Sequence, residues 1–359
     1  MKKIAVVFLF YIFYSFNGKT QTVYMDSLVP MVKHTLKDMP NGTVFSIVIV
    51  TKDAVQYIGL KKDFDEIQSN DYHNYHFEIG SITKVFTATL LSKAIQLKKV
   101  KVDRKINKDL PFNLNENIKI TYQDLANHTS GLPRLTPSLM MSALLNPANP
   151  YKEYGRKDFE HYLQNELELF SKPGEKYDYS NTGAGLLAHT LSYVFNDTFE
   201  NLLAEHIFSV YGMKSIGFNH DEYKNTLIKG IDAEGFEVEN WSFNAMKGAG
   251  GLYAKVQDLA TFAQAHFNAD DELLALTREK TFSISGDFGI GLGWHIIGNE
   301  NKTAYWHNGG TGGYSSSFTM NVDDQKAVIV LSNISALSSY NKEIDPLCFS
   351  LLKKLTSWK

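Results

Sequence analysis

The sequence predicts an α+β fold, an α/β sandwich in which both chain ends build one antiparallel sheet that helices flank. Three observations support this: strand patterns over 43–60, strand patterns again over 291–333, and mainly helical patterns in an insertion of roughly 81–275. With 359 residues, 43% of them hydrophobic, the chain can bury a large core. We expect a cleft where the sheet and the helical insertion meet.

The N-terminus has a different composition from the rest of the chain. Two lysines precede an apolar run from Ile4 to Phe16, after which the sequence turns polar. A membrane-spanning helix needs about 20 apolar residues, so this run has the length of a signal-peptide core instead. We expect residues 1–20 to direct secretion or export to the periplasm and residues 21–359 to form one functional domain. An uncleaved membrane anchor is the alternative.

Composition and spacing exclude several classes of function. A formal net charge of -3 without a basic block argues against a nucleic-acid partner. The 11 histidines are scattered, and one cysteine cannot build a thiolate site, so we expect no metal and no cofactor. His73 and His76 lie three apart, but no acidic or histidine partner follows at zinc spacing. Cys348 lies in an apolar helical pattern and is expected in the core.

The secondary structure expected along the chain follows from periodicity. Residues 43–60 indicate two strands around a turn at Lys52 and Asp53. After Ser81, apolar residues recur on most sides of a helix, which indicates burial. Further helices are expected over 157–170, 183–195, 198–208 and 256–268. Strands joined by short polar turns, typical of an antiparallel meander, are expected over 291–297, 303–309, 314–322 and 326–333. A last helix is expected over about 341–356.

The stretch FEIGSITKVF places Ser81 and Lys84 one helical turn apart. Residues i and i+3 share a helix face, so the amine can reach the hydroxyl, and the Ser81 N–H points out of the helix N-terminus. A lysine in the first turn of an apolar helix opposes the dipole and lacks water. Both effects favour the neutral amine that can accept a proton from serine. The alternative is an ordinary helix cap followed by a surface lysine. The same spacing recurs at 339–342 and 350–353, where we expect solvated lysines.

Two further stretches carry polar residues suited to such a site. In EKYDYSNTGAG, Tyr179 and Asn181 face the same way if the segment is extended. A tyrosine near a lysine ammonium can hold its phenolate form and exchange a proton with a leaving group. In WHNGGTGGYSS, glycines beside His307 let a substrate approach the backbone. Neither pattern is specific alone, since Y-x-N recurs at 72–74 and a glycine hairpin explains the second stretch equally well.

Taken together, five stretches in this order resemble the serine β-lactamase and penicillin-binding protein superfamily. The class C-like branch of esterases and peptidases is the most similar, over roughly 30–355. The stretches are FEIGSITKVFTATLL, ITYQDLANHTSGLP, KPGEKYDYSNTGAGLLA, GAGGLYAKVQDLATFAQ and WHNGGTGGYSS. Their shared order is far more specific than any three-residue pattern.

The resemblance implies roles for the polar residues of the first and third stretches. Ser81 would be the acylated nucleophile and Lys84 its proton acceptor. Tyr179 would pass the proton to the leaving group and help to activate the deacylating water. Asn181 would bind an amide or carbonyl of the substrate. The resemblance therefore implies a serine hydrolase that works through an acyl-enzyme on a small molecule.

The fifth stretch completes the implied site and contains a departure from the family pattern. The backbone N–H groups of Ser81 and Gly310 would form the oxyanion hole, and His307 and Gly309 would line the substrate strand. True β-lactamases of this branch have a lysine where His307 stands, and that lysine faces the substrate carboxylate. Histidine is shorter and mostly neutral at pH 7. An ester, amide or small peptide is therefore the expected substrate rather than a β-lactam.

Two other functions stay open at this point. One is a β-lactamase or D,D-carboxypeptidase. The other, from outside catalysis, is a sensor that binds penicillin or peptidoglycan without turnover, because one scaffold can host several functions. The loop over 133–157 is expected to shape the pocket, and its apolar content hints at hydrophobic substrate parts or a partner surface.

Overall fold

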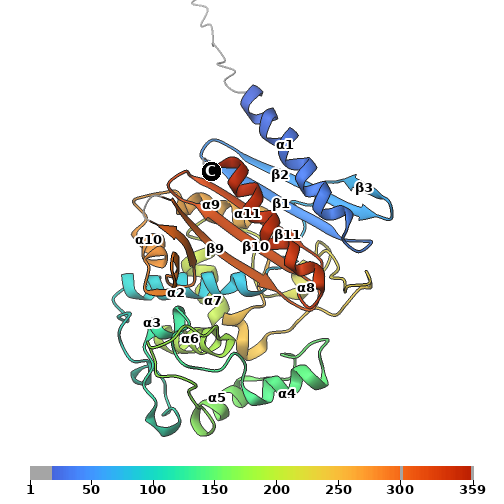
Figure 1. The fold of residues 1–359 in the computed structure, drawn as a ribbon. Helices are drawn as coiled ribbons and strands as arrows, with labels where there is room; N and C mark the ends of the chain where they lie inside the picture. The colour runs from blue at the N-terminus through green and yellow to red at the C-terminus, as the bar shows by residue number, and fades with distance from the viewer. Residues whose placement is uncertain (1–17, 300–301, 357–359) are drawn as a thin grey trace, which may run out of the picture.

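The computed structural model describes residues 18–299 and 302–356 (Figure 1). Residues 1–17, which make up most of the predicted signal peptide, lie outside the described residues, and helix α1 (Gly18–Lys37) begins directly after them. Within the described ranges, every helix is too short or too polar to cross a membrane.

A nine-stranded antiparallel sheet lies at the centre of the molecule, in the order β3-β2-β1-β11-β10-β9-β8-β7-β6. Strand β1 (Val44–Thr51) pairs with β11 (Lys326–Ser332), so the two ends of the chain meet inside the sheet as the sequence predicts. The other strands are β2 (Val55–Asp63), β3 (Glu66–Ser69), β6 (Phe282–Ser285), β7 (Phe288–Ile290), β8 (His295–Asn299), β9 (Lys302–Gly310) and β10 (Ser315–Asn321). A separate pair joins β4 (Phe77–Glu78) to β5 (Tyr253–Ala254).

The sheet departs from the prediction at its edges. Strands β3, β6 and β7 were not expected, because they are short and carry little apolar alternation. The strand predicted over 291–297 begins only at His295. Residues just before it turn instead, with Gly293 at φ +83, and a Cβ on Gly293 would lie 2.8 Å from the Ala88 side chain. This glycine allows the turn to pack directly on helix α2.

Helices cover both faces of the sheet (Figure 1). Helices α1 and α11 (Ile344–Leu355) cover one face and bury Leu28, Val32, Phe45, Val330 and Leu351 in one cluster with the strands. The other face carries the insertion, as predicted. Its helices are α2 (Thr83–Gln96), α3 (Tyr122–Ala126), α4 (Pro137–Leu145), α5 (Arg156–Asn165), α6 (Asn181–Phe195), α7 (Phe199–Leu203), α8 (His220–Tyr223), α9 (Val256–His266) and α10 (Glu272–Arg278).

Single helical turns link these elements. The 3₁₀ turns are η1 (Gly80–Ile82), η2 (Ile106–Lys108), η3 (Asn115–Asn117), η5 (Asn244–Ala249) and η6 (Ser339–Glu343), and a π-helical turn, η4 (Ala204–Phe208), continues α7. The helix predicted over 198–208 is therefore an α-helical turn followed by a π-helical one.

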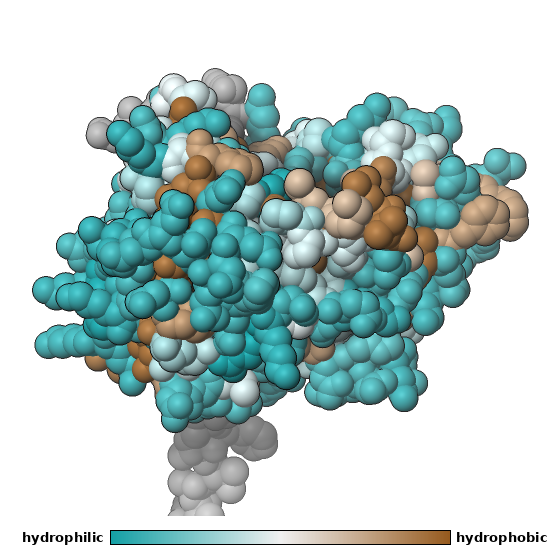
Figure 2. All heavy atoms as spheres, turned by 90° about the horizontal axis from the view of Figure 1, so that it is seen from below, coloured by the Kyte–Doolittle hydropathy of each residue, from teal (hydrophilic) through white to brown (hydrophobic). Residues whose placement is uncertain are grey.

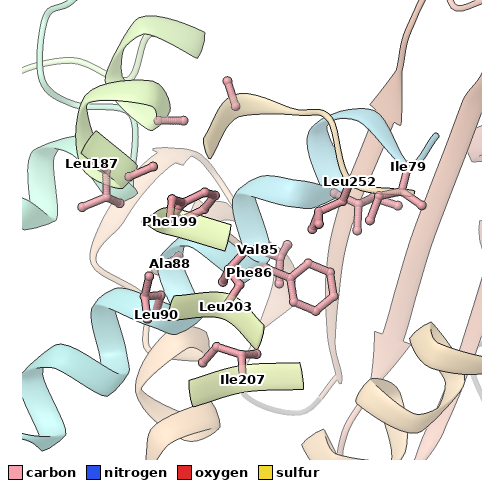
Figure 3. Packing of buried hydrophobic residues seen from close by; sticks show 14 of the residues in the cluster. Ile79, Val85, Phe86, Ala88, Leu90, Leu187, Phe199, Leu203, Ile207 and Leu252 are labelled. Carbon is pink, nitrogen blue, oxygen red and sulfur yellow. The ribbon is translucent and has the colours of Figure 1, made fainter. Parts of the chain in front are cut away.

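Helix α2 is the buried axis of the helical part, as its apolar sequence predicts. Of its 14 residues, 11 are buried. Figure 3 shows Val85, Phe86 and Leu90 packed among side chains of neighbouring helices, including Leu203 and Ile207. The α-helix begins at Thr83, so the serine before it lies in the turn η1. A helix that is buried along most of its length thus supports that turn.

Candidate active site

Ser81 lies where the turn η1 meets the end of strand β9. Gly80 has φ +49, and a Cβ on it would lie 2.4 Å from the backbone nitrogen of Gly310. An ideal Cβ on Gly309 would lie 2.9 Å from the Ser81 nitrogen. Only glycines permit this backbone contact. It brings together the Ser81 and Gly310 N–H groups that the resemblance implies as an oxyanion hole.

Lys84 points back from the first turn of α2 to Ser81. Its Nζ lies 2.9 Å from Ser81 Oγ and donates to the Ala249 carbonyl at 2.7 Å. The side chain is only 3% exposed. Burial lowers the pKa of Lys84 well below its usual value, and the positive charge of Arg134 lowers it further. A neutral amine at this position can accept the Ser81 proton.

Burial distinguishes this pair from the two other serine–lysine pairs at the same spacing. In both 339–342 and 350–353, the serine and the lysine are exposed. Among the described residues, Ser81 therefore has the only buried lysine at this spacing.

The ring of Tyr179 packs among three basic groups. Lys84 Nζ lies 4.9 Å from the ring centroid and Arg134 Cζ lies 5.1 Å from it, and the centroid of the tilted His128 ring lies 4.4 Å away. Burial raises the pKa of Tyr179, and this outweighs the opposing effects of a hydrogen bond with Ser81 and the Arg134 charge. The raised pKa favours the protonated phenol in the free protein over the phenolate that a neighbouring ammonium could hold.

Asn181 reaches the same cavity as Tyr179, but not through an extended segment. It is the first residue of α6, and Ser180 caps the helix by accepting a hydrogen bond from Gly183 N at 2.8 Å. Asn181 Nδ2 donates to the Tyr151 hydroxyl at 3.0 Å. Its Oδ1 is buried without a partner among the described residues. That oxygen is available to accept a hydrogen bond from a bound molecule.

His307 lies behind the cavity rather than on its surface. The side chain is fully buried, and its Nδ1 donates to the Asn308 carbonyl at 2.6 Å. Its ring centroid is 6.3 Å from that of Tyr179 and 5.3 Å from that of His295. Burial lowers the pKa of His307 well below its usual value. In the free protein Asn308 and the glycines that follow line the cavity, and the expected role of His307 along the substrate strand stays a prediction.

The cavity in front of these groups has a volume of 620 Å³. Of the predicted residues, its wall includes Ser81, Tyr179, Asn181, Gly309 and Gly310, while Lys84 lies just beneath. The rest of the wall includes six aromatic side chains, Tyr151, Tyr177, Trp241, Phe243, Phe288 and Trp306. Such a lining suits a molecule with apolar parts.

Sequence reasoning missed three contributors to this site. Arg134 lies in the loop expected to shape the pocket, but no pattern singled it out. Ala249 lies in one of the five stretches, and its backbone carbonyl holds the lysine. Tyr151, which holds Asn181, lies in the same loop as Arg134, where no periodicity marks it. A backbone acceptor and contacts across distant segments leave no local sequence signal.

Comparison with known proteins gives one family and several relatives. The model of the family described as Beta-lactamase matches residues 47–347. Penicillin-binding protein 4* of Bacillus subtilis (strain 168) is 28% identical over 298 residues, which cover 76% of this chain and 63% of the relative. Protein flp of Staphylococcus aureus (strain MW2) is 24% identical over 278 residues, which cover 72% and 53%. The chain thus spans between half and two thirds of the length of these relatives.

Solved structures share the fold along nearly the whole chain. A beta-lactamase/D-alanine carboxypeptidase from Pseudomonas syringae superposes with a TM-score of 0.77 at 18% identity, over 93% of this chain and 99% of that one. A class C beta-lactamase superposes with a TM-score of 0.79 at 16% identity, over 95% and 99%. At these identities the similarity establishes the fold.

Proposed function

The chain belongs to the beta-lactamase family of serine hydrolases, and on this premise we propose that it cleaves an ester, amide or small peptide through an acyl-enzyme on Ser81. One observation carries the proposal: the buried amine of Lys84 lies 2.9 Å from the Ser81 hydroxyl beside an open cavity. Burial lowers the pKa of that amine, which favours the neutral form that accepts a proton.

In the proposed acylation, Ser81 Oγ attacks the acyl carbon while its proton passes to Lys84 Nζ. The carbonyl oxygen becomes an oxyanion, which accepts hydrogen bonds from the N–H groups of Ser81 and Gly310. Tyr179 donates its phenolic proton to the leaving group, and the proton on Lys84 then restores the phenol. The raised pKa of Tyr179 suits this role as an acid, because the free protein holds the proton to be donated.

In the proposed deacylation, a water molecule attacks the acyl carbon of the Ser81 ester. Its proton passes to the neutral Lys84 amine or through Tyr179, and the Ser81 oxygen recovers a proton as the acid product leaves. Asn181 positions the substrate by accepting a hydrogen bond from a substrate N–H at its free Oδ1. The aromatic wall contacts the apolar part of the substrate.

A β-lactamase or D,D-carboxypeptidase is the second candidate, favoured by the names of the relatives and of the structural neighbours. His307 argues against efficient β-lactam hydrolysis, because it is neutral and buried where the family's β-lactamases carry a lysine. We therefore expect slow turnover of a chromogenic cephalosporin compared with a p-nitrophenyl ester. Cephalosporin turnover equal to or faster than ester turnover would favour the second candidate.

A sensor that is acylated without turnover is the alternative outside catalysis. Screening the mature protein against p-nitrophenyl esters, D-amino-acid amides and β-lactams tests all three functions together. Intact mass spectrometry over time then separates them. An adduct that decays with product release supports the hydrolase, whereas an adduct that persists without product contradicts it.

We also propose export, on the strength of the apolar run that precedes the described residues. N-terminal sequencing of the protein from the periplasm or culture medium checks this, with a first residue near 21 expected. Recovery of the intact N-terminus in the membrane fraction would instead support the anchor.

A further inference from the structure

Arg134 is the only residue with a charge at pH 7 among the described residues that line the cavity. No aspartate or glutamate of the described chain lines this wall. His295, the cavity histidine, has its pKa lowered to about 4 by burial. The cavity therefore presents one positive charge among aromatic and amide groups.

The guanidinium of Arg134 has no carboxylate partner within the described chain. Two of the three other arginines do: Arg104 pairs with Asp109, and Arg156 pairs with Glu160 at 2.7 Å. The contact of the Arg134 head is with the Tyr179 ring, 5.1 Å from its centroid. An exposed, unpaired guanidinium offers two parallel N–H donors that match a carboxylate.

The backbone fixes Arg134 on the helical wall of the cavity. Its carbonyl accepts hydrogen bonds from the first two N–H groups of α6, Asn181 N at 3.0 Å and Thr182 N at 3.3 Å. On the sheet side of the cavity, strand β9 contributes Trp306, Asn308 and the two glycines that follow, none of which carries a charge. The positive charge thus lies beside Tyr179 and Asn181 rather than on strand β9.

We propose that Arg134 binds a carboxylate of the substrate on the helical wall, so that the protein prefers anionic esters or amides with an apolar remainder. This inference rests on the proposed function of the same cavity. It assigns the recognition of negative charge to the loop before α4, in place of the strand position that His307 occupies. Binding to Arg134 would also hold the scissile bond close to Tyr179, whose ring the guanidinium contacts.

The apolar remainder has a surface continuous with the cavity. Leu135, Ala143 and Pro150 line the wall next to Arg134, and Ala143 belongs to α4. Four large apolar side chains of α4 are exposed beyond it: Met140, Met141, Leu144 and Leu145. Helix α4 lies near the lower edge of Figure 1. Figure 2 views the molecule from that side, and its surface is mostly hydrophilic with a few apolar areas.

A binding measurement without turnover tests the inference. Glutaric acid monoanilide, which has a free carboxylate, and its uncharged terminal carboxamide are titrated into Ser81→Ala protein by calorimetry. We expect the anion to bind about tenfold more tightly, as for a hydrogen-bonded charge pair, and the preference to shrink in high salt. On the same background, Arg134→Gln should abolish the preference and Arg134→Lys should keep part of it.

Lys152→Gln is the matched control, because it removes the same charge from a nearby residue that does not line the cavity. It should leave the preference for the anion unchanged. Equal affinities for the two anilides, or a preference that survives Arg134→Gln, would overturn the inference. Neither result depends on hydrolysis, so this inference fails separately from the proposed function, which is tested by turnover and by labelling of Ser81.

Discussion

The Lys84 amine lies 2.9 Å from the Ser81 hydroxyl, and the Ala249 carbonyl holds the amine from the other side at 2.7 Å. The turn η1 supplies the serine and helix α2 the lysine, whereas Ala249 comes from a segment more than 160 residues away. The amine therefore has a fixed position and little access to water, the two conditions under which a lysine acts as a base.

Replacing Lys84 should abolish acylation. In Lys84→Met the side chain keeps its length and burial but loses the lone pair that accepts the serine proton. We expect kcat/KM for a p-nitrophenyl ester to fall by about 10²- to 10⁴-fold, the usual contribution of a general base. Lys353→Met, on the exposed end of α11, should retain full activity. Activity of Lys84→Met within a few fold of the parent would contradict the assignment.

The pH dependence of kcat/KM should report the lowered pKa of Lys84. Lys84 works as the neutral base, so activity should rise with pH through a pKa well below 10.5. The raised pKa of Tyr179 implies no loss of activity below pH 10 from this group. Removing the Arg134 charge should raise the pKa of Lys84, so the rising limb of Arg134→Gln should move to higher pH. If the pKa of the rising limb is the same in Arg134→Gln as in the parent, Arg134 does not act on the amine.

Gly80 should be needed for activity because of its close contact with Gly310, and not only because of its left-handed backbone conformation. Gly80 and Gly286 have nearly the same conformation, φ +49 and +51, but a Cβ on Gly80 would meet Gly310 N at 2.4 Å, whereas a Cβ on Gly286 would meet nothing within 4 Å. Both alanine variants should lose about 1 kcal/mol of stability from the left-handed strain. Gly80→Ala should also lose about 10²-fold or more in kcat by separating the oxyanion donors.

Thermal denaturation and kcat of the two glycine variants are compared side by side. Equal losses of activity in Gly80→Ala and Gly286→Ala would show that the contact between η1 and β9 has no part in catalysis.

Acid should destabilise the protein below about pH 6.5. Burial lowers the pKa of both His76 and His295 from 6.5 to about 4. In the unfolded chain these histidines bind protons near pH 6.5, whereas in the folded protein they bind them only near pH 4. The free energy of unfolding therefore falls as the pH drops through this window. Tm should be lower at pH 5 than at pH 7, and His76→Gln, far from the cavity, should reduce that difference. An unchanged Tm between these pH values would contradict the buried, neutral state of these histidines.

The fold could be predicted largely because its main elements carry strong periodicity. The uniformly apolar sequence after Ser81 indicated a buried helix, and the alternation over 303–333 indicated the meander. Short strands near the edge of the sheet, such as β7, carry too few residues for a pattern. Helix α1 was missed although Leu28, Val32 and Leu36 recur at intervals of four, a helical signal that the neighbouring signal-like run obscured.

The polar residues of the site were found through short motifs, but their surroundings were not. The sequence indicated that Lys84 would be short of water, which agrees with its burial, yet it assigned part of the effect to the helix dipole and none to Arg134. The positions of Arg134 and His307 depend on how a loop and a strand meet in three dimensions. Such contacts between distant segments leave no spacing to recognise.

The central claim is that Ser81 is acylated because Lys84 removes its proton. Intact mass spectrometry after exposure to a fluorophosphonate tests this most directly, with the labelled peptide then sequenced. The account predicts one adduct on the peptide that contains Ser81, no adduct in Ser81→Ala, and normal labelling of Ser339→Ala and Ser350→Ala, whose lysines are solvated. Labelling of Ser81→Ala at the parent rate would contradict it.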